Sequence, residues 1–234
     1  MKLSTIAKTS LALGILTTGV ITTNAQSVDA ATQQAVQTKI SAEDLKAYYM
    51  KKPLELKNVS GELSGNVVTV LHHQSQHSEV ELKGNDKDKL TDNDLKDIDV
   101  FLVGEGTSKQ AATRSIGGIT KPNSQIFKDQ IASPQLSISS QDGDFKVINQ
   151  DGPFNIYKEQ ISLKELDFKL RKHLIEKHDL YSKGNNNGVI TVHMKDKKIN
   201  NNYYSFVLDN KLQEHRMGDV IDATQIDRID VEYK

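Results

Sequence analysis

The chain has 234 residues, with 30 Lys and Arg against 31 Asp and Glu, and it contains no cysteine. The balanced charge argues against a nucleic acid as partner, because nucleic-acid-binding domains usually carry a clear basic excess. The absence of cysteine excludes a disulfide scaffold, a thiol nucleophile and a cysteine-based zinc site.

The first thirty residues have the order of a secretory signal peptide. Two lysines precede an apolar run from about Leu11 to Ile21, and small residues lead to a predicted cleavage site near Ala30. The apolar run is shorter than the roughly 20 residues that span a bilayer. We therefore predict a secreted protein without membrane insertion, whose mature part is long enough for one large or two small domains.

The first half of the mature chain reads as short β-strands. After a Gln- and Thr-rich lead-in, a helix is predicted over 41–50, with Ser41 as its cap and Asp44 three positions later. Several short runs then mix β-branched residues with alternation and end near Gly, Asn or Asp. These runs are 54–61, 66–73, 78–84, 97–104, 114–121, 134–140 and 145–150. Strands this short and closely spaced predict a small barrel or sandwich.

One long helix is predicted over residues 158–181. Ser162 and Glu165 form a capping box within it, and its leucines fall at helical spacing on one face. These leucines are Leu163, Leu166, Leu170 and Leu174. Asp167 and Arg171 stand four positions apart, which predicts an ion pair along the helix.

The last part of the chain returns to strands. A loop over 182–188 precedes strands at 189–195 and 203–208, which a hairpin turn joins, and a final strand covers 226–233. A helix laid across such a mixed sheet is an α+β arrangement. The sequence thus predicts an all-β half to about residue 130, followed by a half with a sheet and one helix.

No catalytic motif is present. The sequence lacks a Gly-rich phosphate loop, His-Glu-x-x-His and Gly-x-Ser-x-Gly, and its carboxylates are scattered. We therefore predict a protein that is not an enzyme, and we assign no catalytic residue, no cofactor and no metal.

The histidines raise one alternative, a metal ion held by His73 and His77. Ordinary polar residues at a strand end are favoured, because no nearby carboxylate completes a ligand set. By their spacing, His173 and His178 are placed on the helix surface, and His193 is expected to be half-buried in a strand.

The strongest candidate for a binding site is "YYSFVLDNKLQEHRMGD", residues 203–219. In a strand, Tyr203 and Ser205 share one face, and Arg216 follows a charged turn. Arginine presents a planar fork of donors that suits a carboxylate, so these residues could together hold an acidic sugar. From residue types alone, a surface arginine paired with a nearby carboxylate is the favoured alternative.

Residues 158–181 also resemble the signature of the staphylococcal and streptococcal superantigen toxins. Every position that the signature specifies matches. The matching residues are Lys158, Ile161, Leu166, Asp167, Arg171, Leu174, Leu180 and Tyr181. A second family pattern, Gly-Gly-aliphatic-Thr, appears at 117–120, although Ile116 replaces the usual aromatic residue and Asn123 comes earlier than expected.

Within this group the chain resembles the staphylococcal superantigen-like proteins, on the helix and on "KLQEHRMGDVID" at 211–222. The resemblance implies an α+β protein with an N-terminal OB-fold β-barrel and a C-terminal β-grasp domain. We place the signal peptide at 1–30, the lead-in, short helix and OB-fold domain at 31–130, and the β-grasp domain at 131–234. The resemblance further implies immune evasion by binding host proteins, without enzymatic activity.

One subgroup of that family binds sialylated glycans of the sialyl Lewis X type through the β-grasp domain. In its motif, eleven residues separate a strand Thr from a later Arg, and here eleven separate Ser205 from Arg216. The resemblance implies that Arg216 holds the sialic-acid carboxylate, Ser205 donates its hydroxyl and Asp222 accepts hydrogen bonds from sugar hydroxyls. The sequence departs from the motif with Ser for Thr, Val207 for Glu and Ala223-Thr224 for Gly-Arg.

The implied partners are sialylated glycoproteins on host leukocytes, whose receptor or adhesion function the protein would block. The alternative is a glycan-independent inhibitor of a host immune protein: immunoglobulin, a complement component, an innate immune receptor or another leukocyte surface protein. A true superantigen is disfavoured by the missing cysteines, because true superantigens usually carry a disulfide loop. The sequence leaves open whether the chain forms a homodimer.

Overall fold

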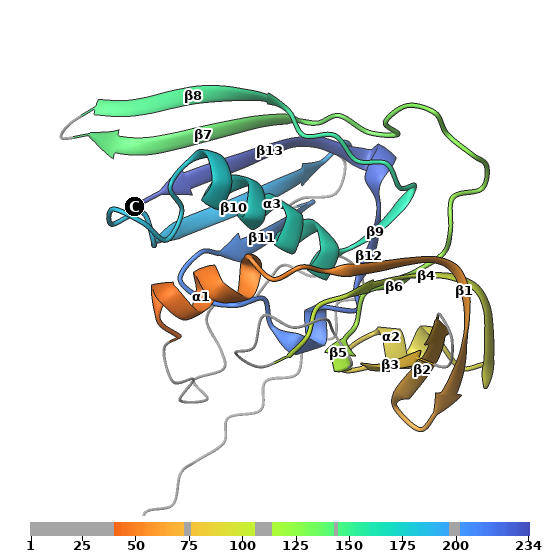
Figure 1. Ribbon diagram of the computed structural model, residues 1–234. Coiled ribbons are helices and arrows are strands. Elements are labelled where there is room, and N and C mark those ends of the chain that lie inside the picture. Colours follow the sequence, from red (N-terminus) through yellow and green to blue (C-terminus); the bar gives the residue numbers. More distant parts are fainter. Residues whose placement is uncertain (1–39, 73–75, 106–113, 143–144, 197–201) are drawn as a thin grey trace, which may run out of the picture.

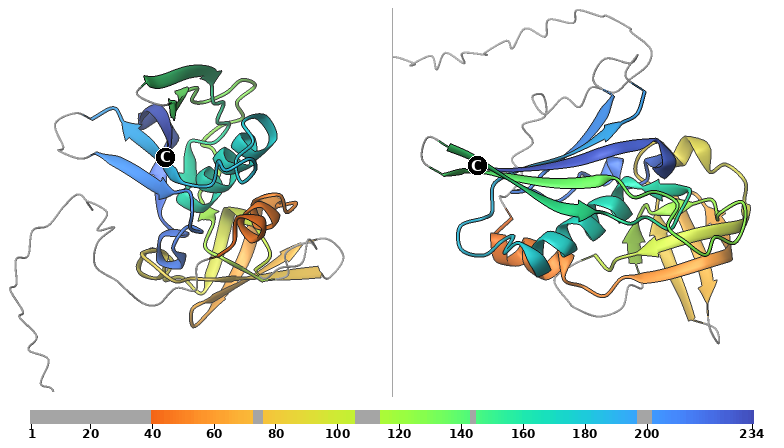
Figure 2. Two further views of the ribbon diagram at one scale, coloured as in Figure 1. Left: turned by 90° about the vertical axis from the view of Figure 1, so that its left-hand side faces the viewer. Right: turned by 90° about the horizontal axis from the view of Figure 1, so that it is seen from above.

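The computed structural model describes residues 40–72, 76–105, 114–142, 145–196 and 202–234. The predicted signal peptide, His73 and most of the predicted hairpin turn after residue 195 lie outside these residues. The described chain forms two β-sheet domains, and one long helix lies between the sheet of the second domain and the first (Figures 1 and 2). No helix among the described residues is long and apolar enough to cross a membrane.

The first domain is a six-stranded sheet with the order β5-β3-β2-β1-β4-β6. Its strands are β1 (Leu54–Ser64), β2 (Val67–His72), β3 (Gln76–Glu81), β4 (Asp94–Leu102), β5 (Arg114–Ile116) and β6 (Ile119–Thr120). The β3–β5 pair is parallel and the other neighbours are antiparallel. A one-turn helix, α2 (Asp86–Lys89), follows β3 and was not predicted.

Helix α1 (Ala42–Tyr49) begins where the sequence predicts, because the Ser41 hydroxyl accepts a hydrogen bond from the Asp44 N–H at 3.0 Å. Its buried residues Leu45 and Tyr49 belong to the same apolar core as the long helix of the second domain. The helix that precedes the barrel thus packs at the junction of the two domains (Figure 1).

The predicted strand at 114–121 is interrupted by Gly117 and Gly118, which adopt left-handed conformations with φ of 55° and 92°. A Cβ atom on Gly117 would lie 2.6 Å from the backbone nitrogen of Gly218, and one on Gly118 would lie 2.5 Å from the Phe101 carbonyl oxygen. Glycine is needed at both positions for the backbone conformation, at Gly117 also for the close approach of the second domain and at Gly118 for that of β4.

The second domain is a mixed five-stranded sheet with the order β11-β10-β13-β7-β8, accompanied by the two-stranded pair β12-β9. The strands are β7 (Gln135–Asp142), β8 (Phe145–Pro153), β9 (Gln160–Ser162), β10 (Gly188–Met194), β11 (Tyr203–Val207), β12 (Val220–Asp222) and β13 (Ile226–Tyr233). Only the β13–β7 pair is parallel. The predicted mixed sheet with one long helix is confirmed, whereas β9 and β12 were missed.

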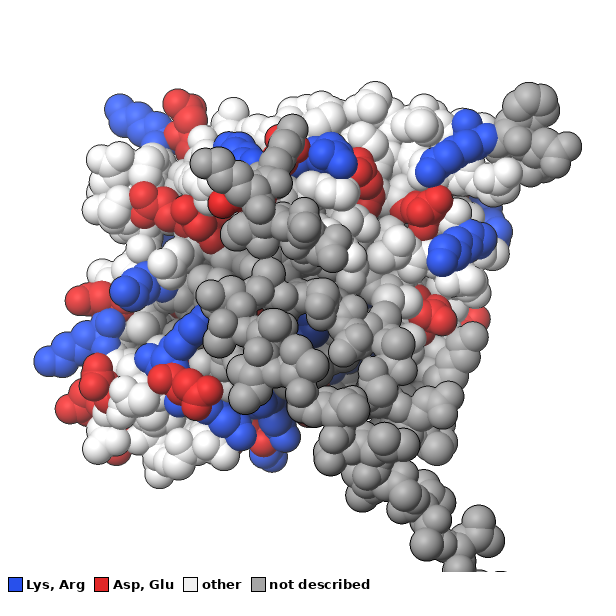
Figure 3. Space-filling model, turned by 180° about the vertical axis from the view of Figure 1, so that it is seen from behind, with Lys and Arg blue, Asp and Glu red and all other residues white. Residues whose placement is uncertain are grey.

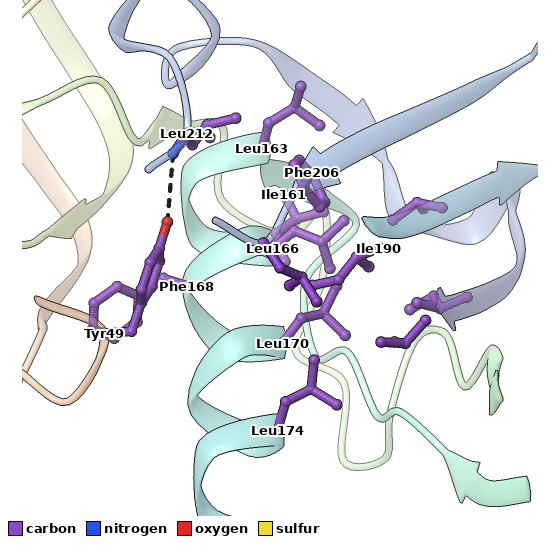
Figure 4. Packing of buried hydrophobic residues seen from close by; sticks show 14 of the residues in the cluster. Tyr49, Ile161, Leu163, Leu166, Phe168, Leu170, Leu174, Ile190, Phe206 and Leu212 are labelled. Carbon is purple, nitrogen blue, oxygen red and sulfur yellow. Dashed lines mark hydrogen bonds between the residues drawn. The ribbon is translucent and has the colours of Figure 1, made fainter. Parts of the chain in front are cut away.

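The long helix, α3 (Leu163–Lys177), is shorter than predicted. It begins at Leu163 because the Ser162 hydroxyl accepts a hydrogen bond from the Glu165 N–H at 3.1 Å, so the predicted capping box marks the true start. Residues 160–162 instead form β9 against β12. The predicted leucine face is confirmed: its four leucines are fully buried and point toward Ile190 and Phe206 of the sheet (Figure 4).

The predicted ion pair between Asp167 and Arg171 is confirmed at 2.7 Å, but it lies in the core, since Arg171 is 0% exposed. The guanidinium also donates to the carbonyl oxygens of Val207 and Leu208, at 2.9 and 3.0 Å, and to the Tyr181 hydroxyl. Each of its three nitrogens therefore donates to a protein acceptor, and the end of β11 is tied to the centre of α3.

We predict that Arg171→Met lowers the free energy of unfolding by about 3–5 kcal/mol, because it leaves Asp167 as a buried charge without its partner. The matched control is Lys183→Met, which removes a second i,i+4 pair, to Asp179, that is exposed. Urea unfolding of both variants should show a large change only for Arg171→Met. Equal, small changes would contradict this account of the core.

Candidate functional site

Ser205 lies in β11, the terminal strand of the five-stranded sheet, opposite Thr191 of β10. Phe206 is buried in the core that contains α3, and Tyr204 packs against the same core. Because side chains alternate along a strand, Tyr203 and Ser205 lie on the other face of the sheet, as the sequence predicts.

Arg216 ends a one-turn 3₁₀ helix, η1 (Glu214–Arg216), in the connection from β11 to β12. The side chain is 8% exposed and reaches back to β11. Its Nη1 donates to the Ser205 carbonyl oxygen and to the Gln213 side-chain oxygen, both at 3.0 Å. The structure thus brings Arg216 and Ser205 together, through the main chain of Ser205.

Residue types alone favoured a surface arginine paired with a nearby carboxylate, and this pair does not form among the described residues. No carboxylate in the described part of the chain makes an ion pair with Arg216. Glu214 lies 3.7 Å from Lys83 instead, and Asp219 accepts a hydrogen bond from Asn85 at 3.0 Å. Both neighbouring carboxylates therefore face the first domain.

One nitrogen of the Arg216 guanidinium has no hydrogen-bond partner among the described residues. This nitrogen, Nη2, is buried. Burial lowers the pKa of Arg216, against the opposing effects of Asp167, Asp219 and Tyr204. A buried donor without a partner costs about 1–3 kcal/mol, and more when it is charged. An anion that reached Nη2 would remove this cost.

Asp222 is exposed and already has a local partner. Its Oδ1 accepts hydrogen bonds from the backbone and the hydroxyl of Thr224, at 2.9 and 2.6 Å, and so caps the short helix η2 (Ala223–Gln225). No hydrogen bond or ion pair among the described residues joins Asp222 to Ser205 or Arg216. The glycan-binding motif has Arg at the position of Thr224. Here Thr224 donates hydrogen bonds to one oxygen of the Asp222 carboxylate.

Two residues of the site were not singled out from the sequence. Gln213 accepts a hydrogen bond from Nη1 of Arg216. The only indication of this contact in the sequence is that Gln213 precedes Arg216 by three residues. Tyr204 is half-buried and adjoins Ser205 in β11. Burial and then Asp219 raise the pKa of its hydroxyl, while Arg216 lowers it.

The turn that carries Arg216 is clamped against the first domain. A Cβ atom on Gly84 would lie 1.7 Å from the His215 carbonyl oxygen, and one on Gly218 would lie 2.0 Å from an Asp86 carboxylate oxygen. With the hydrogen bond from Asn85 to Asp219, these approaches fix the turn between β11 and the loop that precedes α2. Both domains therefore position the site.

A shallow depression of about 510 Å³ lies on the face of the sheet opposite α3, and its lining includes Thr191, the partner of Ser205 in β10. Its lining also includes Ser139, Lys146, His193 and Asp230. Neither Ser205, Arg216 nor Asp222 lines it. On the face seen in Figure 3, the visible Lys and Arg are interspersed with Asp and Glu, so that view contains no purely basic surface for a nucleic acid.

Comparison with known protein families matches both domains. Residues 43–123 match the model of the staphylococcal superantigen-like OB-fold domain, and residues 134–233 match that of the staphylococcal/streptococcal toxin beta-grasp domain. The predicted fold class, an N-terminal OB-fold domain and a C-terminal β-grasp domain with one long helix, is confirmed. These two domains together define a class of non-enzymatic bacterial toxins.

Comparison with individual relatives identifies the family within this class of toxins. The chain is 46% identical to superantigen-like protein 11 of Staphylococcus aureus over 82% of this chain and 95% of that protein. It is 45% identical to staphylococcal superantigen-like 1 of S. aureus strain Newman over the full length of both. The crystal structure of the staphylococcal superantigen-like protein SSL5 complexed with sialyl Lewis X superposes with a TM-score of 0.73, at 34% identity, over 83% of this chain and 100% of that one. The chain belongs to the staphylococcal superantigen-like family.

We predict that Gly84→Ala displaces the turn at residues 214–219 and lowers the free energy of unfolding by about 1–3 kcal/mol, because the new methyl group meets the His215 backbone. NMR backbone amide signals of this turn report the displacement. The control is Gly65→Ala, where a Cβ atom has open space and only the left-handed backbone is strained. Unmoved turn signals in Gly84→Ala would refute the clamp.

Proposed function

We propose that the protein is a secreted exotoxin that binds sialylated glycans on host leukocyte glycoproteins through Arg216 and Ser205, and so serves immune evasion. The observation that carries the proposal is the buried Arg216 donor without a partner, on a side chain that reaches back across the eleven-residue spacing to the Ser205 backbone. The solved complex of a family member, SSL5, with sialyl Lewis X supports the choice of ligand class.

The chemistry of Arg216 suits the one charged group of a sialic acid. A guanidinium binds a carboxylate through two parallel N–H···O bonds. Nη1 is held by two acceptors, so the carboxylate would be met by Nη2 and its neighbouring donors. Because Nη2 is shielded in the free protein, binding requires side chains at the site to rotate, as is common at binding surfaces.

The other polar groups would then form hydrogen bonds with uncharged groups of the sugar rather than with its carboxylate. Ser205 would donate its hydroxyl, Tyr204 adds a second hydroxyl at the edge of the sheet, and Asp222 would accept hydrogen bonds from sugar hydroxyls through the oxygen that Thr224 leaves. The dissociation constant of a single site with so few contacts is expected to be on the order of micromolar. Clustered glycans on a leukocyte surface would raise the effective affinity.

The mechanism is competition. A protein that occupies sialylated glycans blocks the receptors and adhesion molecules that need them, and no chemical step is involved. Binding that survives sialidase treatment of the target would instead favour the glycan-independent inhibitor of a host immune protein.

We predict that Arg216→Ala weakens binding to sialylated glycan arrays by roughly 10- to 100-fold, because a hydrogen bond to a charged group contributes about 1.5–3 kcal/mol. Arg216→Lys should recover only part of the loss, since Lys keeps the charge but lacks the planar fork. Sialidase treatment of the array should abolish binding of the unmutated protein.

The matched control is Arg228→Ala, which removes an exposed arginine of the same domain that contacts Asp227 and Asp230. It should leave array binding unchanged. Thermal unfolding of each variant separates a lost contact from a lost fold. Array binding by a folded Arg216→Ala variant at the unmutated level would rule out this site.

A further inference from the structure

A second cluster of polar side chains, independent of the glycan site, lies at the C-terminal end of α3. Asp151 comes from β8, His173 from the last turns of α3, and His178 is the residue that ends the helix. His173 Nε2 lies 2.5 Å from one oxygen of the Asp151 carboxylate, and His178 Nε2 lies 3.0 Å from the other. One carboxylate therefore bridges two imidazoles.

The backbone holds these three groups in place. The His178 N–H donates to the Leu174 carbonyl oxygen at 2.9 Å, and Asp179 then turns the chain with a φ of 55°. The His173 ring packs edge-on against Phe154, with centroids 6.1 Å apart. The cluster thus sits on regular structure rather than on a long loop, which is what a preorganised site requires.

The bonding state of the cluster is incomplete. His178 Nε2 is buried, and despite its distance from Asp151 it forms no hydrogen bond within the described residues. Burial raises the pKa of Asp151, but the neighbouring imidazoles of His173 and His178 outweigh this effect, so the pKa is lowered overall. The carboxylate is therefore ionised at neutral pH, and His178 Nε2 lies close to it without a hydrogen bond of good geometry.

We propose that Asp151, His173 and His178 bind a divalent transition-metal ion, Zn²⁺, with one ligand atom from each residue. These ligand atoms all lie within 4.8 Å of one another. Zinc bonds to histidine nitrogen and carboxylate oxygen are about 2.0–2.2 Å long, so ligand atoms around a tetrahedral ion are about 3.3–3.6 Å apart. Small rotations of the side chains close the difference. A fourth position stays open for water or another donor.

Two imidazoles and a carboxylate are a donor set that suits zinc. The ion would join β8, the edge strand of the sheet on the side away from β11, to the end of α3. Without an ion, Asp151 contacts both imidazoles directly, and the experiment has to separate these two states.

Equilibrium dialysis of the protein against ZnCl₂ should give one Zn²⁺ per chain, and Zn²⁺ should raise the midpoint of thermal unfolding, because a ligand that binds only the folded state stabilises it. His173→Gln and Asp151→Asn should each weaken binding at least about tenfold. His77→Gln is the control, since it removes a histidine of the other cluster noted in the sequence, and it should bind zinc normally.

No bound zinc, or unchanged binding in either His173→Gln or Asp151→Asn, would overturn the proposal. Loss of binding in His77→Gln would place the ion elsewhere and overturn it too. If a variant does not fold in the absence of metal, NMR of the unmutated protein tests the zinc site instead. Zn²⁺ should shift the imidazole signals of His173 and His178, and shifts confined to other histidines would refute the site.

Discussion

The buried pair of Asp167 and Arg171 is the interaction on which the rest of the structure depends. Arg171 is 0% exposed, and it can remain charged there only because Asp167, Tyr181 and two backbone carbonyls accept its hydrogen bonds. Asp167 in turn accepts from the Tyr49 hydroxyl at 2.7 Å. One pair of charges therefore joins α1, α3 and the end of β11, and Tyr49 also contacts the backbone of Leu212 (Figure 4).

A second set of contacts joins the start of α3 to the first domain. Lys158 donates to Thr120 of the first domain at 2.8 Å and to Glu165 of α3 at 3.0 Å, so the start of α3 is tied to the barrel. Since Arg171 fixes where β11 ends, the connection that carries Arg216 starts from a rigid point. The residues of the family signature thus record folding and domain docking, and their effect on Arg216 is indirect.

Local signals in the sequence predicted much of the fold, because caps and periodicity act over a few residues. Ser41 and Ser162 marked the starts of both main helices. The sequence did not reveal that residues 160–162 pair with β12 as a strand, that Gly84 lies against the turn of Arg216, or that Asp151 lies between two histidines. Each depends on a contact between distant segments. The Ser205-to-Arg216 spacing was visible only through the family resemblance, and the contact that it encodes uses a backbone carbonyl.

The central claim is that the edge of β11 and the turn of Arg216 form the surface that meets a sialylated sugar. An NMR titration of the protein with sialyl Lewis X, and in parallel with Lewis X that lacks sialic acid, tests it most directly. We expect the sialylated sugar alone to shift the backbone signals of Tyr204 and Ser205 and of residues 213–219. Equal shifts with both sugars, or shifts confined to the depression on the open face of the sheet, would contradict the account.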